Sequence, residues 1–131
     1  MLNITKYINV KTGFIGAIIM ASIVGYINHE FGMWPATIAA LKQGTYTFFF
    51  GGAVIQFCET LSLKYPDHSW KGILLGALSA SVVTIIAVLI VHHMRGTPLP
   101  FASTVPTMVL GPPGFLFLAW RKRWVADRNS T

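Results

Sequence analysis

A run of 20 residues, 72–91, contains no charged side chain. A helix rises 1.5 Å per residue, so this run spans about 30 Å, the thickness of the hydrocarbon core of a bilayer. A second uncharged run covers 101–120, and shorter ones cover 13–27 and 45–58. These four runs predict helices that cross a membrane.

The composition excludes two other classes of protein. Of the 131 residues, 53% are hydrophobic and only 11% are charged, whereas a soluble domain carries about 25% charged residues. A disordered chain needs low hydrophobicity and high charge, so that class is excluded as well. Cys58 is the single cysteine, which excludes an intrachain disulfide framework and a cysteine-rich zinc site.

We therefore predict an all-α protein, an integral membrane four-helix bundle that forms a single transmembrane domain over 1–131. The expected helices run at about 10–29, 36–62, 71–93 and 101–122. The last of these contains the adjacent residues Pro112 and Pro113. Proline removes a backbone donor and clashes with the preceding turn, so we expect the fourth helix to be kinked or broken there.

The basic residues predict an orientation. Four spans place eight of the ten Lys and Arg residues on one side of the membrane: Lys6, Lys11, Lys64, Lys71, Arg121, Lys122, Arg123 and Arg128. Lys42 and Arg95 fall on the other side. Because cytoplasmic loops carry an excess of Lys and Arg, we expect both termini in the cytoplasm and a multi-pass protein of a bacterial inner (plasma) membrane.

The net charge of +6 is thus interpreted as an orientation signal, and no nucleic-acid partner is expected. The partners that the pattern predicts are the lipid bilayer and other membrane chains or copies of this chain. The basic run Arg121, Lys122 and Arg123 is expected to contact lipid headgroups, since anionic lipids attract basic segments next to a membrane helix.

One candidate site lies at two expected helix breaks, Gly51–Gly52 in the second helix and Gly111–Gly114 in the fourth, because unwound segments of transporters bind ions or substrates. Gln56 and Glu59 are three residues apart and share a helix face, and an ionisable residue within a span suggests a function. The structural alternative is a kink that improves packing, with Glu59 at the interface or paired with Lys64. The candidate substrate- or ion-binding residues are Gly51, Gly52, Gln56, Glu59, Gly111, Pro112 and Pro113.

A second candidate site comprises His29, Glu30, His92 and His93, at the outer ends of the first and third helices. Imidazoles brought together there would suit a metal, a haem or a quinone headgroup. Adjacent His92 and His93 point about 100° apart on a helix, and the i,i+4 spacing of metal-binding histidines is missing. This favours interfacial histidines without a ligand, and the sequence specifies no cofactor.

Small residues recur at helical spacing in two of the expected spans. They are Gly13, Gly16, Ala21 and Gly25 in the first, and Gly72, Gly76, Ser79 and Ala80 in the third. Such stripes let membrane helices approach closely, within one protein or between partners. The sequence has no Walker A, H-E-x-x-H, G-x-S-x-G or C-x-x-C motif.

The function that these features favour is that of an accessory or scaffold subunit, or a homo-oligomer, without catalytic machinery of its own. Two alternatives stay open. The first is a small oligomeric transporter or channel with its site at the helix breaks. The second is a membrane cofactor or metal binder that uses the outer histidines.

Overall fold

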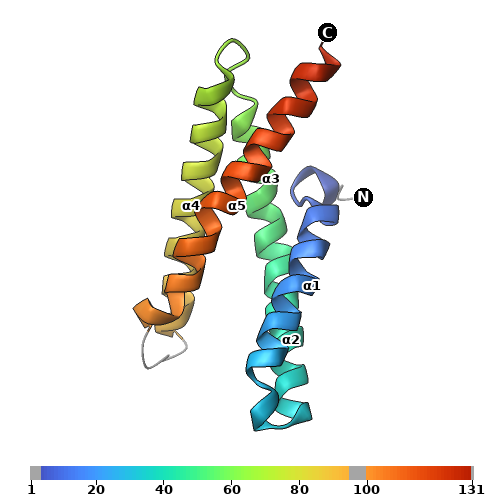
Figure 1. Ribbon diagram of the computed structural model, residues 1–131, viewed down its shortest axis with the longest axis vertical. Helices are drawn as coiled ribbons and strands as arrows, with labels where there is room; N and C mark the ends of the chain where they lie inside the picture. Colours follow the sequence, from blue (N-terminus) through green and yellow to red (C-terminus); the bar gives the residue numbers. More distant parts are fainter. Residues whose placement is uncertain (1–3, 95–99, 131) are drawn as a thin grey trace. The chain divides into compact units, whose positions relative to one another are not determined.

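The computed structural model describes residues 4–94 and 100–130, and these residues are helical with no strand among them. The main elements are α1 (Val10–Ile27), α2 (Met33–Tyr46), α3 (Gly52–Ser62), α4 (Ser69–Met94) and α5 (Pro100–Asn129). A π-helical segment, η3 (Thr47–Gly51), joins α2 to α3 without a gap. The described chain therefore forms four helical rods (Figure 1), which confirms the all-α prediction.

The rods match the predicted helices closely, except at the end of α5. This helix continues to Asn129 instead of ending near residue 122. Beyond the basic run, Arg123 pairs with Asp127 one turn later, at 3.0 Å between Nε and Oδ1. Pairs at i,i+4 lie on the same helix face and stabilise it, so the helix extends past its apolar part.

Local signals explain where the first two rods begin. The side chain of Asn9 accepts a hydrogen bond from the backbone N–H of Thr12 at 3.1 Å, which caps the start of α1. Before α2, Gly32 has a φ of 102°, a conformation that favours glycine. A short 3-10 turn, η2 (His29–Phe31), precedes this glycine and completes the reversal between the first two rods.

The fourth rod corrects the expectation of a helix break. Of the two outcomes predicted at Pro112 and Pro113, a kink or a break, the break does not occur: α5 is continuous through Pro106, Pro112 and Pro113. A proline removes one intrahelical hydrogen bond and its ring crowds the preceding turn, but a helix can continue where the surroundings keep the helical path.

The second rod also continues through its predicted break, but with a change of helix type. The five residues Thr47–Gly51 form a π-helical turn, and π-turns are rare interruptions of α-helices. Here α1 approaches so closely that a Cβ on Gly13 would lie 3.1 Å from the Cα of Gly52. The backbone N–H of Asn9 donates to the carbonyl of Gly52 at 3.0 Å.

The chain divides into two compact units, unit 1 (Met1–Gln56) and unit 2 (Phe57–Thr131). Unit 1 contains α1, α2, η3 and the first turn of α3. Unit 2 contains the rest of α3 together with α4 and α5. In unit 2, a Cβ on Gly72 or Gly76 would collide with the α3 backbone at Ser62 or Cys58. The predicted small-residue faces therefore do form close helix contacts.

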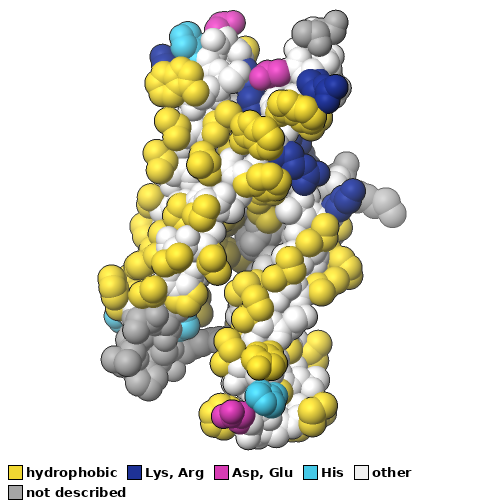
Figure 2. All heavy atoms as spheres, in the orientation of Figure 1, with side chains coloured by type: hydrophobic (Ala, Val, Ile, Leu, Met, Phe, Trp, Pro, Cys, Tyr) yellow, Lys and Arg dark blue, Asp and Glu magenta, His cyan; other side chains and the backbone are white. Residues whose placement is uncertain are grey.

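Both units bury small side chains and expose large ones. The buried apolar residues are Ala17, Ala36, Val54, Cys58, Ala77, Ala80 and Ala119. In contrast, Ile18, Leu78 and Leu110 are 53%, 61% and 66% exposed. Figure 2 shows hydrophobic side chains over most of the visible face. In water this surface would be an aggregation liability, because large contiguous apolar patches are rare on soluble monomers.

Among the described residues, two helices are long and apolar enough to cross a membrane. They are α1, with 18 residues and a mean hydropathy of 1.7, and α4, with 26 residues and a mean hydropathy of 2.7. The second and fourth rods do not meet this criterion of length and apolar composition. The π-segment divides the second rod into shorter helices, and prolines and terminal cations interrupt the apolar sequence of α5.

Candidate functional site

A group of charged and polar side chains lies at one end of unit 2. We call it the polar cluster, and it comprises Glu59, Ser69, Lys122, Arg123 and Asp127. Glu59 comes from the end of α3, Ser69 begins α4, and the other three lie near the end of α5. The cluster thus joins three helices of unit 2 through residues that are distant in the sequence.

The Glu59 carboxylate forms an ion pair with Lys122. The lysine Nζ lies 3.2 Å from Oε2 of Glu59. The side chain of Glu59 is 10% exposed, and that of Lys122 is 42% exposed. The sequence offered either an interfacial position for Glu59 or a pairing with Lys64, whereas the ion pair in the structure joins Glu59 to Lys122. Packing of α3, α4 and α5 brings Lys122 to the buried acid, whereas Lys64 lies beyond the end of α3 and is exposed.

Arg123 is the most buried basic residue of the cluster, with its side chain 6% exposed. Its Nε donates to Asp127 at 3.0 Å, and its Nη2 donates to the carbonyl of Pro66 in the turn after α3. Asp127 also accepts a hydrogen bond from the Ser69 hydroxyl at 3.2 Å. A buried charge is costly unless it is paired, and here each charge has a partner from the same unit.

The cluster is built to hold helices together. Both of its carboxylates are already paired with cations, so the arrangement fixes the end of α5 against α3 and the start of α4. Of the three basic residues predicted to contact lipid headgroups, Arg121 is exposed, Lys122 is half-buried in the ion pair, and Arg123 is buried.

The residues of the predicted transport site are divided between the units. Gly51 and Gly52 lie at the junction of η3 and α3 in unit 1, and Gly111, Pro112 and Pro113 lie within α5 in unit 2. Gln56 and Glu59 are one turn apart on α3, as predicted, with Gln56 half-buried and Glu59 buried. The ion pair with Lys122 connects Glu59 to α5 within unit 2.

The predicted histidine site is divided in the same way. In unit 1, His29 and Glu30 are exposed, and the His29 ring stacks on Tyr26 at 5.2 Å between centroids. In unit 2, His92 and His93 end α4, and Nδ1 of His93 lies 3.0 Å from the carbonyl of Leu89. Within the described part of each unit, no three His, Cys, Asp or Glu side chains are grouped to hold a metal ion.

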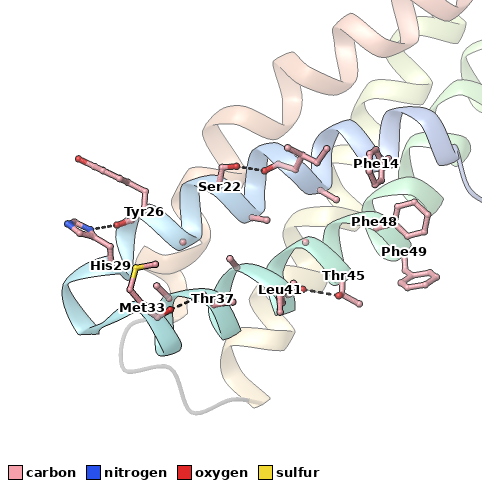
Figure 3. A pocket seen from close by; sticks show the side chains of 17 residues that line it. Phe14, Ser22, Tyr26, His29, Met33, Thr37, Leu41, Thr45, Phe48 and Phe49 are labelled. Carbon is pink, nitrogen blue, oxygen red and sulfur yellow. Dashed lines mark hydrogen bonds between the residues drawn. The ribbon is translucent and has the colours of Figure 1, made fainter.

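Unit 1 contains an open groove of about 780 Å³ between α1 and α2, which we call the α1–α2 groove (Figure 3). Small residues bring the two helices together along it. A Cβ on Gly25 would lie 3.3 Å from that of Ala40, and a Cβ on Gly44 would lie 3.3 Å from that of Ala21. Phe14, Phe48 and Phe49 line one end, and Tyr26, His29 and Met33 line the other.

The hydroxyl groups that line the α1–α2 groove are satisfied by their own helices. Ser22, Thr37 and Thr45 each donate to the carbonyl four residues earlier at 2.8 Å, as the dashed lines in Figure 3 show. Such local bonds leave little capacity for binding a polar ligand. The groove therefore presents a mainly apolar surface that suits a helix or an acyl chain.

Neither the α1–α2 groove nor the pairing within the polar cluster was predicted from the sequence. The spacing of Ala36, Ala40 and Gly44 is a small-xxx-small pattern that could have revealed the α2 side of the groove. The Arg123–Asp127 spacing could have indicated the extension of α5. No comparable pattern links Glu59 to Lys122, because their contact depends on tertiary packing.

No family model matches this chain, and no curated protein or solved structure does so either.

Proposed function

We propose that this chain is an integral membrane protein that works by packing against other membrane chains or against copies of itself. In this proposal all four helical rods span the bilayer as a bundle, with both termini in the cytoplasm. The protein is an accessory or scaffold subunit, or a homo-oligomer, and it carries no catalytic machinery of its own.

The distribution of side chains supports insertion of the rods into a membrane. The apolar windows of α1 and α4 are only 11% and 22% buried within the chain, whereas the core helix of a soluble protein is mostly buried. Helix contacts made by small residues are typical of membrane proteins, because the hydrophobic effect does not drive association between helices in lipid. Lipid tails or partner helices would cover the exposed side chains.

The positions of the basic residues support the proposed orientation. In unit 2, hydrogen bonds join the end of α5 to the turn after α3 and to the start of α4. The basic residues of these segments consequently lie at one end of the unit: Lys64, Lys71, Arg121, Lys122, Arg123 and Arg128. An accumulation of positive charge at one end of membrane helices is typical of the cytoplasmic side.

The observation that carries the proposed function is the α1–α2 groove. It is about 780 Å³ in volume, and its hydroxyl groups are bonded to their own helices. Small residues at its base let another helix approach the backbone closely. A groove of this kind on a membrane helix pair suits the side chains of a transmembrane helix.

The experiment is extraction of the full chain in a mild detergent, followed by mass measurement of the particle and mass spectrometry of its chains. We expect a particle that contains additional chains, either copies or partners. Ser22→Trp, which fills the α1–α2 groove from an exposed position, should reduce the associated fraction at least several-fold.

Ile23→Trp is the matched control, because Ile23 is the next residue of α1, is 45% exposed, and is not among the residues that line the groove. This variant should associate like the wild type. A monodisperse monomer in the wild type, or equal association of the two variants, would contradict the proposal.

A further inference from the structure

A stripe of aromatic and basic side chains follows one face of α5 near its end. We call it the α5 stripe, and it comprises Phe117, Trp120, Arg121, Trp124 and Arg128. The spacings of three and four residues place these side chains along one helix face. Ring centroids lie 6.1 Å apart for Phe117 and Trp120 and 6.3 Å apart for Trp120 and Trp124. The Cζ atom of Arg128 lies 4.6 Å from the Trp124 centroid.

The α5 stripe faces outward from unit 2. Phe117, Trp120 and Trp124 are 56%, 50% and 48% exposed, and Arg121 and Arg128 are exposed as well. The surface is amphipathic because it combines three exposed aromatic rings with two exposed cations. Trp is enriched at membrane–water interfaces for the same reason, since its ring is apolar and its N–H is polar.

The charge balance around the stripe favours an anion. The acidic residues of the polar cluster are paired inside unit 2, Glu59 with Lys122 and Asp127 with Arg123. Two described acids at this end are exposed: Asp127, which is paired with Arg123, and Asp67, in the turn after α3. Arg121, Arg128, Lys64 and Lys71 are the exposed cations around it, so the surface is positive overall.

The start of α4 repeats the combination of a cation and an indole ring. Nζ of Lys71 lies 5.7 Å from the centroid of the exposed Trp70 ring. The hydrogen bond from Ser69 to Asp127 joins this part of α4 to the end of α5. Two helices of unit 2 therefore present cation–aromatic pairs at the same end.

The length of α5 gives the depth of the stripe in a bilayer. The helix has 30 residues, which corresponds to about 45 Å at 1.5 Å per residue. The hydrocarbon core is about 30 Å thick, so a span that begins at Pro100 leaves the core close to Trp120. This step rests on the proposed membrane insertion, and it places residues 120–128 among the lipid headgroups.

We propose that the α5 stripe binds the headgroups of anionic phospholipids at the cytoplasmic surface. Arg121 and Arg128 bind the lipid phosphate, and Trp120 and Trp124 lie between the headgroups and the upper acyl chains. Arg123 takes no part because it is buried in the polar cluster. The occupant is a lipid because the cations adjoin a continuous apolar surface, which a free phosphate ion does not require.

The experiment uses the full chain with Trp34 replaced by phenylalanine, so that Trp70, Trp120 and Trp124 report on the end under test. The protein is reconstituted into vesicles of phosphatidylcholine mixed with phosphatidylglycerol, and one lipid at a time carries brominated acyl chains that quench tryptophan fluorescence. We expect stronger quenching by brominated phosphatidylglycerol than by brominated phosphatidylcholine at equal mole fraction.

The double variant Arg121→Gln with Arg128→Gln should lose most of this preference. A basic residue at an anionic surface is worth about fivefold in affinity, or about 1 kcal/mol, so we expect the relative affinity for the anionic lipid to fall tenfold or more. Lys6→Gln with Lys11→Gln is the matched control, because it removes two exposed cations from unit 1 and should leave the preference unchanged.

Three other results would each contradict a different part of the proposal. Equal quenching by the two brominated lipids, or equal loss of preference in the test and control variants, contradicts headgroup binding. If inorganic phosphate suppresses the preference more than chloride at equal ionic strength, the bound species is free phosphate and the lipid assignment is wrong. Quenching by neither lipid contradicts membrane insertion itself, and with it the proposed function.

Discussion

Glu59 lies near the end of α3, and its ion-pair partner comes from α5. In the sequence it is an acidic residue near the end of an apolar span, a position that suggests a transport or proton-relay function. In the folded unit its side chain is 10% exposed and lies 3.2 Å from Nζ of Lys122. An acid paired in this way links α3 to α5, and its removal would leave Lys122 without that partner.

At the residue scale we predict energetic coupling between Glu59 and Lys122. In a double-mutant cycle with Glu59→Gln and Lys122→Met, the coupling in the free energy of unfolding should be about 0.5–3 kcal/mol, the range for residues in direct contact. The measurement is thermal or denaturant unfolding in detergent, followed by circular dichroism. The matched cycle with Lys64→Met should give a coupling close to zero, and equal couplings in the two cycles would contradict the assigned pair.

The glycines of α4 show how the contact between two helices depends on side-chain size. The backbone of α3 lies so close to Gly72 and Gly76 that an added Cβ would meet the carbonyl oxygens of Ser62 and Cys58. The Cys58 thiol in turn lies 3.6 Å from the carbonyl of Phe115. Close packing of α3 against α4 therefore depends on the absence of side chains at these two glycines of α4.

At the element scale we predict that Gly76→Ala separates α3 from α4. The added methyl group overpacks the contact, and overpacking costs about 1–3 kcal/mol, so the midpoint of thermal unfolding should fall. Gly114→Ala in α5 is the matched control, since nothing lies within 4 Å of its added Cβ. The assigned contact would be wrong if both variants unfolded at the wild-type temperature.

The helix α5 contains three internal prolines and is nevertheless continuous. Locally, adjacent prolines predict an interrupted helix, yet α5 is continuous from Pro100 to Asn129. The second rod contains a π-helical turn, Thr47–Gly51, in place of the predicted break. Both segments keep a helical path, which bonds most backbone groups within the segment, as a chain in lipid requires.

For the whole molecule, the proposed arrangement predicts which parts of the chain face the cytoplasm. Reporter fusions at residues 66 and 131 should both report the cytoplasm, and a fusion at Gly32, in the turn between α1 and α2, should report the opposite side. The physical reason is the concentration of Lys and Arg near residues 66 and 131. Opposite locations for residues 66 and 131 would contradict an arrangement in which α4 and α5 both span the membrane.

The helical class and the extent of the first three rods could be predicted from the amino-acid sequence alone. Uncharged runs of helical length and the spacing of glycines carried this information, because helix formation and apolar composition are local properties of the chain. The same patterns identified the small-residue faces, and the close contacts at Gly13, Gly72 and Gly76 confirm them. The four spans and their orientation are still predictions.

The contacts between side chains of different helices depend on tertiary packing. The pairing of Glu59 with Lys122 joins residues that are 63 positions apart, and the α1–α2 groove is formed by the surfaces of two different helices. Periodicity describes one helix at a time, whereas burial and charge pairing depend on the neighbour that packing supplies. For that reason Arg123, one of three adjacent basic residues in the sequence, is buried in the fold while Arg121 stays exposed.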